Sequence, residues 1–227
     1  MQNFKLTYDV DIAFCIDTTG SMQHVIDIVK RNALKLYPDI SSAMKAKGKV
    51  ISSLRIRVIA FRDYQCDGDM AMQTSPFFTL PDEAAQFEEC VNLLSADGGG
   101  DPPESGLEAL AYAIRSDWKK DSMKRRHIIA LYTDAAAHAL GTGSSSEHYA
   151  KGLPKTFEEL TDWWGDAQNS SAYINRHAKR LLLFAPSVKP WTTISAWDNT
   201  ILSPMALDSG LTELEYDMIL SSIVNSI

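Results

Sequence analysis

The sequence predicts an α/β protein: a doubly wound, mostly parallel central sheet flanked by helices on both faces. Apolar runs of strand length alternate along the chain with segments of helical length, which is the pattern of such a sheet. The core runs are apolar almost throughout, as expected of strands that are buried on both faces. No linker or internal repeat interrupts the pattern. We therefore expect one domain over residues 1–227, with a core over about 8–205 and a closing helix over about 211–225.

The expected strands are short apolar runs bounded by polar or turn residues. They cover residues 8–16, 54–61, 75–80, 126–132, 179–185 and 200–207. Pro76 places the run 75–80 at an edge of the sheet, since proline has no N–H to donate to a neighbouring strand.

The expected helices fill the segments between these strands. They cover residues 20–47, 81–94, 102–118, 156–164 and 191–197. In the first, Val25, Ile28 and Leu34 belong to the apolar face, and Gly48 ends the helix. Thr156 is a suitable N-cap for the fourth, with Glu159 as its reciprocal cap.

The composition is that of an ordinary soluble protein, with 45% hydrophobic and 22% charged residues. The net charge of −7 argues against nucleic acid or an anionic membrane as partner, because either requires a basic face. The three cysteines fit neither an even disulfide framework nor a metal-binding pair, so we expect reduced thiols. The first residues lack the apolar core of a signal peptide, and we expect a cytoplasmic protein that is a monomer by default.

Polar side chains follow the first predicted strand at alternate positions, namely Asp17, Thr19 and Ser21. Asp134 ends a later core strand, and Asp101 lies on a glycine-rich loop that enters a helix. Ligands bind beyond the carboxyl ends of the strands in such sheets, and acids that converge there need a cation between them. Hard oxygen donors suit Mg²⁺, Mn²⁺ or Ca²⁺.

Three stretches carry a family resemblance. Residues 17–22, Asp-Thr-Thr-Gly-Ser-Met, resemble the D-x-[ST]-G-S-M form of the metal-ion-dependent adhesion site of von Willebrand factor A (vWA) domains. Residues 98–104 and 131–135 resemble the second and third metal-site loops of the family, in the family's order. The resemblance covers about residues 8–205 and implies a Rossmann-like vWA fold. The GGGD-x-PE form of the second loop is similar to that of intracellular and bacterial members, and the motif style resembles the domain attached to some alpha-type kinases.

The resemblance implies a divalent cation, most simply Mg²⁺, held by five residues. Thr19 and Ser21 would ligate it directly, Asp17 and Asp134 would bind through water or orient the ligands, and Asp101 would complete the site. Many vWA domains have threonine at the position of Asp101. A further carboxylate should tighten cation binding and weaken the ion's attraction for an acidic group of a partner. The implied function is non-catalytic, metal-dependent binding of another protein.

Simpler interpretations of the same residues remain open. Asp17 could only cap the first helix, Asp134 could only end a strand, and Asp101 could be an exposed turn acid. His138, in the loop beside the expected site, could contact a partner or the ion's outer shell, or be an ordinary loop histidine. The run Arg62-Asp63-Tyr64 could shape the rim of the site or simply end a strand.

Two other functions also remain open. One is an Mg²⁺-dependent phosphohydrolase that uses Asp17 as nucleophile, although that chemistry needs a second acid at the position held by Thr19. The other is a structural subunit whose metal site does not function.

Overall fold

One sheet of seven strands forms the centre of the protein in the computed structural model, which describes residues 6–100, 102–165 and 172–227. The strands are β1 (Leu6–Asp17), β2 (Lys49–Phe61), β3 (Met72–Thr74), β4 (Phe78–Leu80), β5 (Arg125–Tyr132), β6 (Lys179–Pro186) and β7 (Thr200–Met205). The helices are α1 (Gln23–Asn32), α2 (Leu36–Ala46), α3 (Ala84–Asn92), α4 (Gly106–Ile114), α5 (Phe157–Trp164), α6 (Trp191–Ile194) and α7 (Tyr216–Ser226), and the 3₁₀ helices are η1 (Gly20–Met22) and η2 (Gly68–Ala71). The predicted α/β class is confirmed.

The strand order is β3-β2-β1-β5-β6-β7, and β4 also pairs with β2. The central strands β2, β1, β5, β6 and β7 are parallel to one another, whereas β3 and β4 run antiparallel to β2. The chain leaves β1 toward β2 on one side and later returns to β5 on the other. The strand order therefore reverses between β1 and β5, and open α/β sheets bind ligands beyond the carboxyl ends of the strands at such a point.

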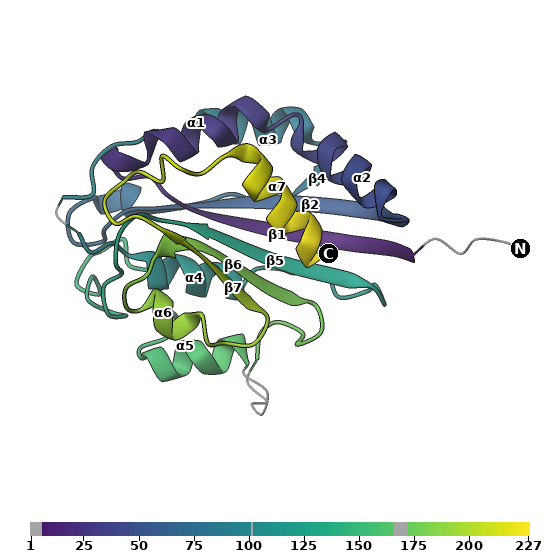
Figure 1. Cartoon of the computed structure of the whole chain (residues 1–227). Coiled ribbons are helices and arrows are strands. Elements are labelled where there is room, and N and C mark those ends of the chain that lie inside the picture. Colours follow the sequence, from purple (N-terminus) through teal and green to yellow (C-terminus); the bar gives the residue numbers. More distant parts are fainter. Residues whose placement is uncertain (1–5, 101, 166–171) are drawn as a thin grey trace, which may run out of the picture.

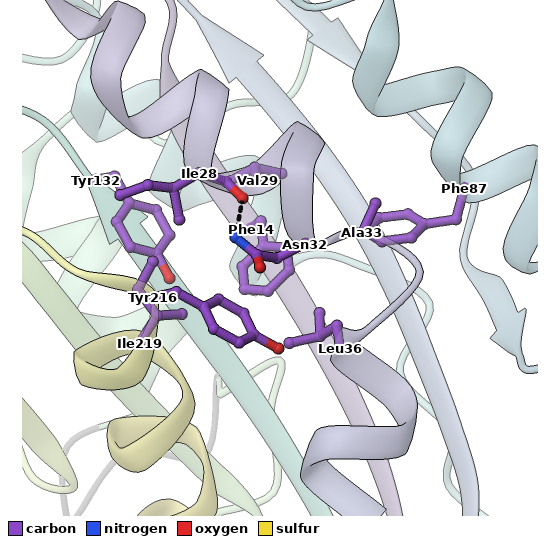
Figure 2. A pocket seen from close by; sticks show the side chains of 10 residues that line it. All are labelled: Phe14, Ile28, Val29, Asn32, Ala33, Leu36, Phe87, Tyr132, Tyr216 and Ile219. Carbon is purple, nitrogen blue, oxygen red and sulfur yellow. Dashed lines mark hydrogen bonds between the residues drawn. The ribbon is translucent and has the colours of Figure 1, made fainter.

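Helices cover both faces of the sheet (Figure 1). α1, α2, α3 and α7 pack on one face, and α4, α5 and α6 pack on the other. Alternate residues of β1 supply the two cores: Val10, Ile12 and Phe14 point to the first face, while Ala13 and Cys15 point to the second. Burial on both faces explains why the strand sequences are apolar almost throughout.

The expectation of one helix over residues 20–47 is wrong. The chain instead forms η1, α1 and α2, with a turn at residues 33–35. Pro38 explains the break, because it has no N–H to donate to the carbonyl of Leu34 and its ring would clash with that carbonyl in a continuous helix. Since the helix restarts at Leu36, Pro38 falls in the first turn, where its missing N–H is tolerated. Leu34 is consequently 52% exposed and does not belong to an apolar face.

Three helices begin later than predicted: α3 starts at Ala84 and not at 81, and the late starts of α4 and α7 have identifiable causes. α4 starts at Gly106 and not at the predicted residue 102, because the residues before it pair with the loop that follows β5. The N–H of Glu104 donates to the carbonyl of Ala136 at 3.0 Å. α7 starts at Tyr216 and not at the predicted residue 211. Leu211 and Leu214, in the non-helical segment before it, are already buried in the core. Tertiary contacts therefore fix both segments in a non-helical conformation before the helices begin.

Several local predictions are confirmed. Thr156 caps α5 by accepting a hydrogen bond of 3.1 Å from the N–H of Glu159. β4 lies at the edge of the sheet, as the proline before it predicts. The three cysteines, all within the described residues, are free thiols. In the described part of the chain, no helix has the length and apolar character needed to cross a membrane.

Candidate metal centre

Three loops meet at the carboxyl edge of the sheet, beside the point where the strand order reverses; this edge lies on the left in Figure 1. Asp17 is the last residue of β1, and Asp134 follows closely after β5. The glycine-rich loop before α4 joins both: the N–H of Asp97 donates to the carbonyl of Thr18 at 3.0 Å, and Glu104 pairs with the loop after β5. Segments that are distant in the sequence are thus held together by backbone hydrogen bonds.

Asp17 is fully buried (0% exposed), and both of its carboxylate oxygens accept hydrogen bonds. Oδ1 accepts from the N–H of Thr19 at 2.9 Å and from its hydroxyl at 2.7 Å, while Oδ2 accepts from the hydroxyl of Thr133 at 2.7 Å. Burial raises the pKa of Asp17 to about 6, against the opposing effect of these hydrogen bonds. Neither η1 nor α1 has a side-chain cap, so the interpretation of Asp17 as only a helix cap is wrong.

Ser21 and Asp134 form the second contact of the site. The hydroxyl of Ser21 donates to Asp134 Oδ1 at 3.1 Å, and the N–H of Gly210 donates to Oδ2 at 2.7 Å. Gly210 belongs to the loop between β7 and α7 and has φ +63°; a Cβ there would lie 2.2 Å from the carbonyl oxygen of Ser21. Asp134 therefore does more than end a strand, since it holds a site hydroxyl and a third loop.

The glycine-rich loop approaches Thr19 so closely that a side chain would not fit. Gly98, Gly99 and Gly100 all have positive φ, and a Cβ on Gly99 would lie 2.4 Å from Thr19 Cγ2. Glycine is therefore required at position 99 by both the backbone conformation and the contact with Thr19. Asp101, the remaining predicted ligand, lies outside the described residues.

Glu104 is a site residue that the sequence analysis missed. It is 3% exposed, and its Oε1 lies 3.0 Å from the position that a Cβ on Gly99 would take. Its Oε2 is buried and has no hydrogen-bond partner among the described residues. Burial and the negative charges of nearby acids raise its pKa to about 9; these acids are Asp17, Asp63, Asp67 and Asp134. The sequence did carry a signal, because the run from Asp101 to Glu104 contains two acids and only the first was assigned.

Hydroxyl and carboxylate residues line a pocket of about 410 Å³. The lining residues are Thr19, Gly20, Ser21, Gly98, Gly100, Pro102, Glu104, Asp134, Ala135 and Asp208, with no Lys, Arg or His among them in the described parts of the chain. Within the same parts, no three His, Cys, Asp or Glu side chains are grouped so that they could hold a metal ion by themselves. The hydroxyls of Thr19 and Ser21 would have to take part. A hard-oxygen donor set with an unpartnered buried carboxylate oxygen fits a hard divalent cation.

Asp63, Asp67 and His138 lie around this centre and support it. His138 Nε2 is 3.4 Å from Asp63 Oδ2, and the His138 N–H donates to the carbonyl of Glu104 at 2.9 Å. The carboxylate of Asp67 accepts from the N–H of Gly99 at 3.2 Å and so holds the glycine-rich loop. Asp63 does more than end a strand. His138 Nε2 is buried and has no hydrogen-bond partner among the described residues, so the contacts do not decide between the two interpretations of His138.

Two relatives share part of their length with this chain. An alpha-protein kinase of Dictyostelium discoideum, vwkA, is 26% identical over 171 residues, which are 71% of this chain and 25% of the kinase. An ariadne-like RING finger protein of Acanthamoeba polyphaga mimivirus is 28% identical over 180 residues, which are 74% of this chain and 16% of that protein. The chain thus spans a quarter or less of the length of these relatives.

Two solved structures show the same fold at low sequence identity. Proximal thread matrix protein 1 of the mussel byssus has a TM-score of 0.53 and 11% identity, with 98% of this chain and 49% of that chain covered. The pilus adhesin SpaC of Lactobacillus rhamnosus GG, in its open conformation, has a TM-score of 0.51 and 12% identity, with 99% and 30% covered.

The family comparison covers all three motif stretches at the carboxyl edge. A von Willebrand factor A domain model matches residues 11–145, more than half of the chain. The chain therefore belongs to the von Willebrand factor A domain family.

Proposed function

We propose that this chain is a non-catalytic protein-binding module whose contact with its partner depends on a divalent cation, most simply Mg²⁺. One observation carries the proposal. Two hydroxyl residues and two acids line an open pocket at the point of strand-order reversal, namely Thr19, Ser21, Glu104 and Asp134, and the buried Asp17 accepts a hydrogen bond from Thr19 behind them. As family membership suggests, we regard this edge as a metal-ion-dependent adhesion site.

The hydrogen bonds orient the hydroxyls in a way that suits cation binding. Thr19 directs its hydroxyl hydrogen to Asp17, and Ser21 directs its hydrogen to Asp134. Each hydroxyl oxygen therefore keeps its lone pairs for another contact, and both residues line the pocket. Asp17 and Asp134 would act as orienting residues behind the two ligands. A bound Mg²⁺ would supply positive charge and a coordination position that an oxygen of the partner could fill.

Glu104 extends the predicted ligand set. Its unpartnered oxygen would gain a partner in a cation, which removes the cost of a buried acceptor without a hydrogen bond. We propose that Glu104 and Asp101 together give the GGGD-x-PE form of the site its acidic character. Added negative charge strengthens cation binding and weakens the ion's residual attraction for a partner carboxylate. A neutral oxygen donor from the partner therefore suits this site at least as well as an acid does.

Catalysis by Asp17 fits the geometry poorly. Both of its oxygens accept hydrogen bonds and the residue is fully buried, so neither oxygen is available to attack a substrate. In the described parts of the chain, the pocket offers no cationic side chain to balance a phosphoryl group. The unpartnered oxygen of Glu104 also favours a working site over a purely structural subunit with a non-functional one.

Two further observations bear on the compartment of the module and on the longer chain to which it could belong. The three free thiols are compatible with the reducing cytoplasm, which we propose as its compartment. The relatives are much longer proteins, so the proposal includes a role as the binding part of a larger chain.

Affinity capture from the source lysate tests the proposal. The parent protein and an Asp17→Asn variant are compared with Mg²⁺ and with a chelator. We expect a partner that is recovered with the parent in Mg²⁺. It should be absent from the parent with chelator and from the Asp17→Asn variant under both conditions. If the same proteins are recovered in all four, the metal centre is not the interface.

A further inference from the structure

The amino edge of the sheet, where the parallel strands begin, is basic although the whole chain carries a net charge of −7. Residues 119–126 alone contain five Lys or Arg and one Asp. We call six side chains here the basic edge: Lys49, Lys120, Lys124, Arg125, Arg126 and Arg180. In Figure 1 this edge lies on the right, at the opposite end of the strands from the metal centre.

Three of these cations begin strands of the sheet and lie near one another, although the strand register does not align them directly. Lys49 begins β2, Arg126 lies at the start of β5, and Arg180 lies at the start of the neighbouring β6. The ring of Tyr8 on β1 lies between the first two, 5.3 Å from Lys49 Nζ and 5.4 Å from Arg126 Cζ. Burial and the charge of Arg126 lower the pKa of Arg180, and the charge of Asp198 opposes this effect.

The charges of the basic edge are not neutralised locally. Among the described residues, none of its six side chains forms an ion pair. Two adjacent acids already have partners: Asp11 pairs with Arg55 at 2.6 Å, and Asp9 pairs with Lys119 at 3.0 Å. Asp198, which faces Arg180, pairs with Lys179 at 2.8 Å. Asp121, an exposed acid in the same loop, offsets one of the six positive charges, so the basic edge keeps a net positive charge.

Backbone carbonyls hold the arginine side chains in place. Arg126 Nη1 donates to the carbonyl of Arg125 at 2.9 Å, and Arg180 Nη1 donates to the carbonyl of Lys179 at 2.6 Å. Arg125 Nη1 donates to the carbonyl of Ser122 at 2.6 Å. Side chains that are already ordered lose little conformational entropy when they bind an anion.

Apolar side chains also reach solvent beside these cations. Met123, at the tip of the loop before β5, is 102% exposed, and Leu6, at the start of β1, is 44% exposed. Arg126 and Arg180 lie on adjacent strands about 4.8 Å apart, and the register offsets them by two residues along the strands, because Arg180 is opposite Ile128. Acidic side chains on one side of an extended segment recur at a comparable interval, about 6.5 Å.

We propose that the basic edge binds an extended acidic segment of another protein, whose carboxylates pair with these cations. A fixed set of ordered guanidinium groups favours a polypeptide, because a fluid lipid surface gains nothing from fixed spacing. This interaction is separate from the proposed metal-dependent one and lies at the other end of the strands.

Fluorescence anisotropy tests the proposal with a short labelled peptide rich in glutamate, at about 0.15 M salt, where the Debye length is about 8 Å. An Arg126→Gln/Arg180→Gln variant should bind at least about tenfold more weakly than the parent, which corresponds to about 1.4 kcal/mol. A Lys120→Gln/Lys124→Gln variant should also bind more weakly, and it changes only exposed side chains, so its fold is not at risk. A chelator should leave binding unchanged, which separates this result from any failure of the metal centre.

An Arg31→Gln/Lys35→Gln variant is the matched control, because it removes the same charge at two exposed positions, one in the last turn of α1 and one in the turn before α2. It should bind the peptide as the parent does. The proposal is overturned if the parent does not bind the peptide, or if the control weakens binding as much as the basic-edge variants do. It is also overturned if the parent binds phosphatidylserine vesicles or RNA in preference to the peptide.

Discussion

The N–H of Gly210 donates a hydrogen bond of 2.7 Å to Asp134 Oδ2, so the loop that leads into α7 is bonded directly to the candidate metal centre. The same carboxylate accepts from Ser21 through its other oxygen. One acid thus joins the helical turn after β1, the end of β5 and the loop after β7. The geometry of the centre depends on all three.

Replacement of Gly210 by alanine should therefore disturb both stability and cation binding. The left-handed φ costs alanine about 1–2 kcal/mol, and overlap of Cβ with the carbonyl of Ser21 adds to this. We expect a loss of about 3 kcal/mol, seen as a fall in Tm of about 10 °C, together with weaker Mg²⁺ binding. Gly48→Ala is the control, since Gly48 has φ +71° with no atom near its Cβ position. Equal effects of the two variants would show that the contact with Ser21 is unimportant.

The raised pKa of Glu104, about 9, predicts how stability depends on pH without a cation. The folded protein binds this proton more tightly than the unfolded chain does, so the stabilisation is complete below the ordinary pKa and is lost as pH rises toward 9. Asp17, with a pKa of about 6, acts in the same direction at lower pH. The Tm of the cation-free protein should fall between pH 5 and 8, and Mg²⁺ should raise it more at pH 8.

Glu104→Gln should flatten this dependence, because glutamine has no proton to lose. An exposed acid replaced in the same way, Asp82→Asn, should leave the profile unchanged. A cation-free Tm that rises steadily from pH 5 to 8 in the parent would contradict the assigned protonation of the centre.

Lys179 should be the most sensitive charged residue of the second core. It is fully buried; its Nζ donates to the carbonyls of Trp164 and Gly165 at 2.7 Å and pairs with Asp198 at 2.8 Å. Lys179→Met leaves two carbonyls and a carboxylate without this donor, so urea unfolding should show a loss of about 3–5 kcal/mol. Lys155→Met, at an exposed position, should change stability by less than about 0.5 kcal/mol. A loss at Lys179 as small as that would show that the buried contacts contribute little.

Much of the fold could be predicted because the strand and cap signals are local. The apolar runs of β1, β5 and β6 and the Thr156 cap require no knowledge of distant residues. The break between α1 and α2 was also available locally, through Pro38, but the apolar periodicity on either side outweighed it. The late starts of α4 and α7 depend on tertiary contacts, which no local pattern contains.

The candidate centre was predictable only in part for the same reason. Asp17, Thr19 and Ser21 carry the motif, and the structure brings them together with Asp134. The orphaned oxygen of Glu104 and the bond from Gly210 became visible only when the loops were placed in space. Asp101 remains a predicted ligand.

Calorimetric titration with Mg²⁺ tests the central claim most directly, with the parent, Asp17→Asn and the control Asp82→Asn. Asparagine keeps the shape of Asp17: its Oδ1 can still accept from Thr19, and its Nδ2 can donate to the hydroxyl oxygen of Thr133, whereas alanine would leave both hydroxyls without a partner at this position. The account predicts that the parent and the control bind one cation per chain, and that Asp17→Asn binds at least about 10–100-fold more weakly while keeping its fold. A parent protein that binds no divalent cation, or an Asp17→Asn variant that binds as the parent does, would contradict it.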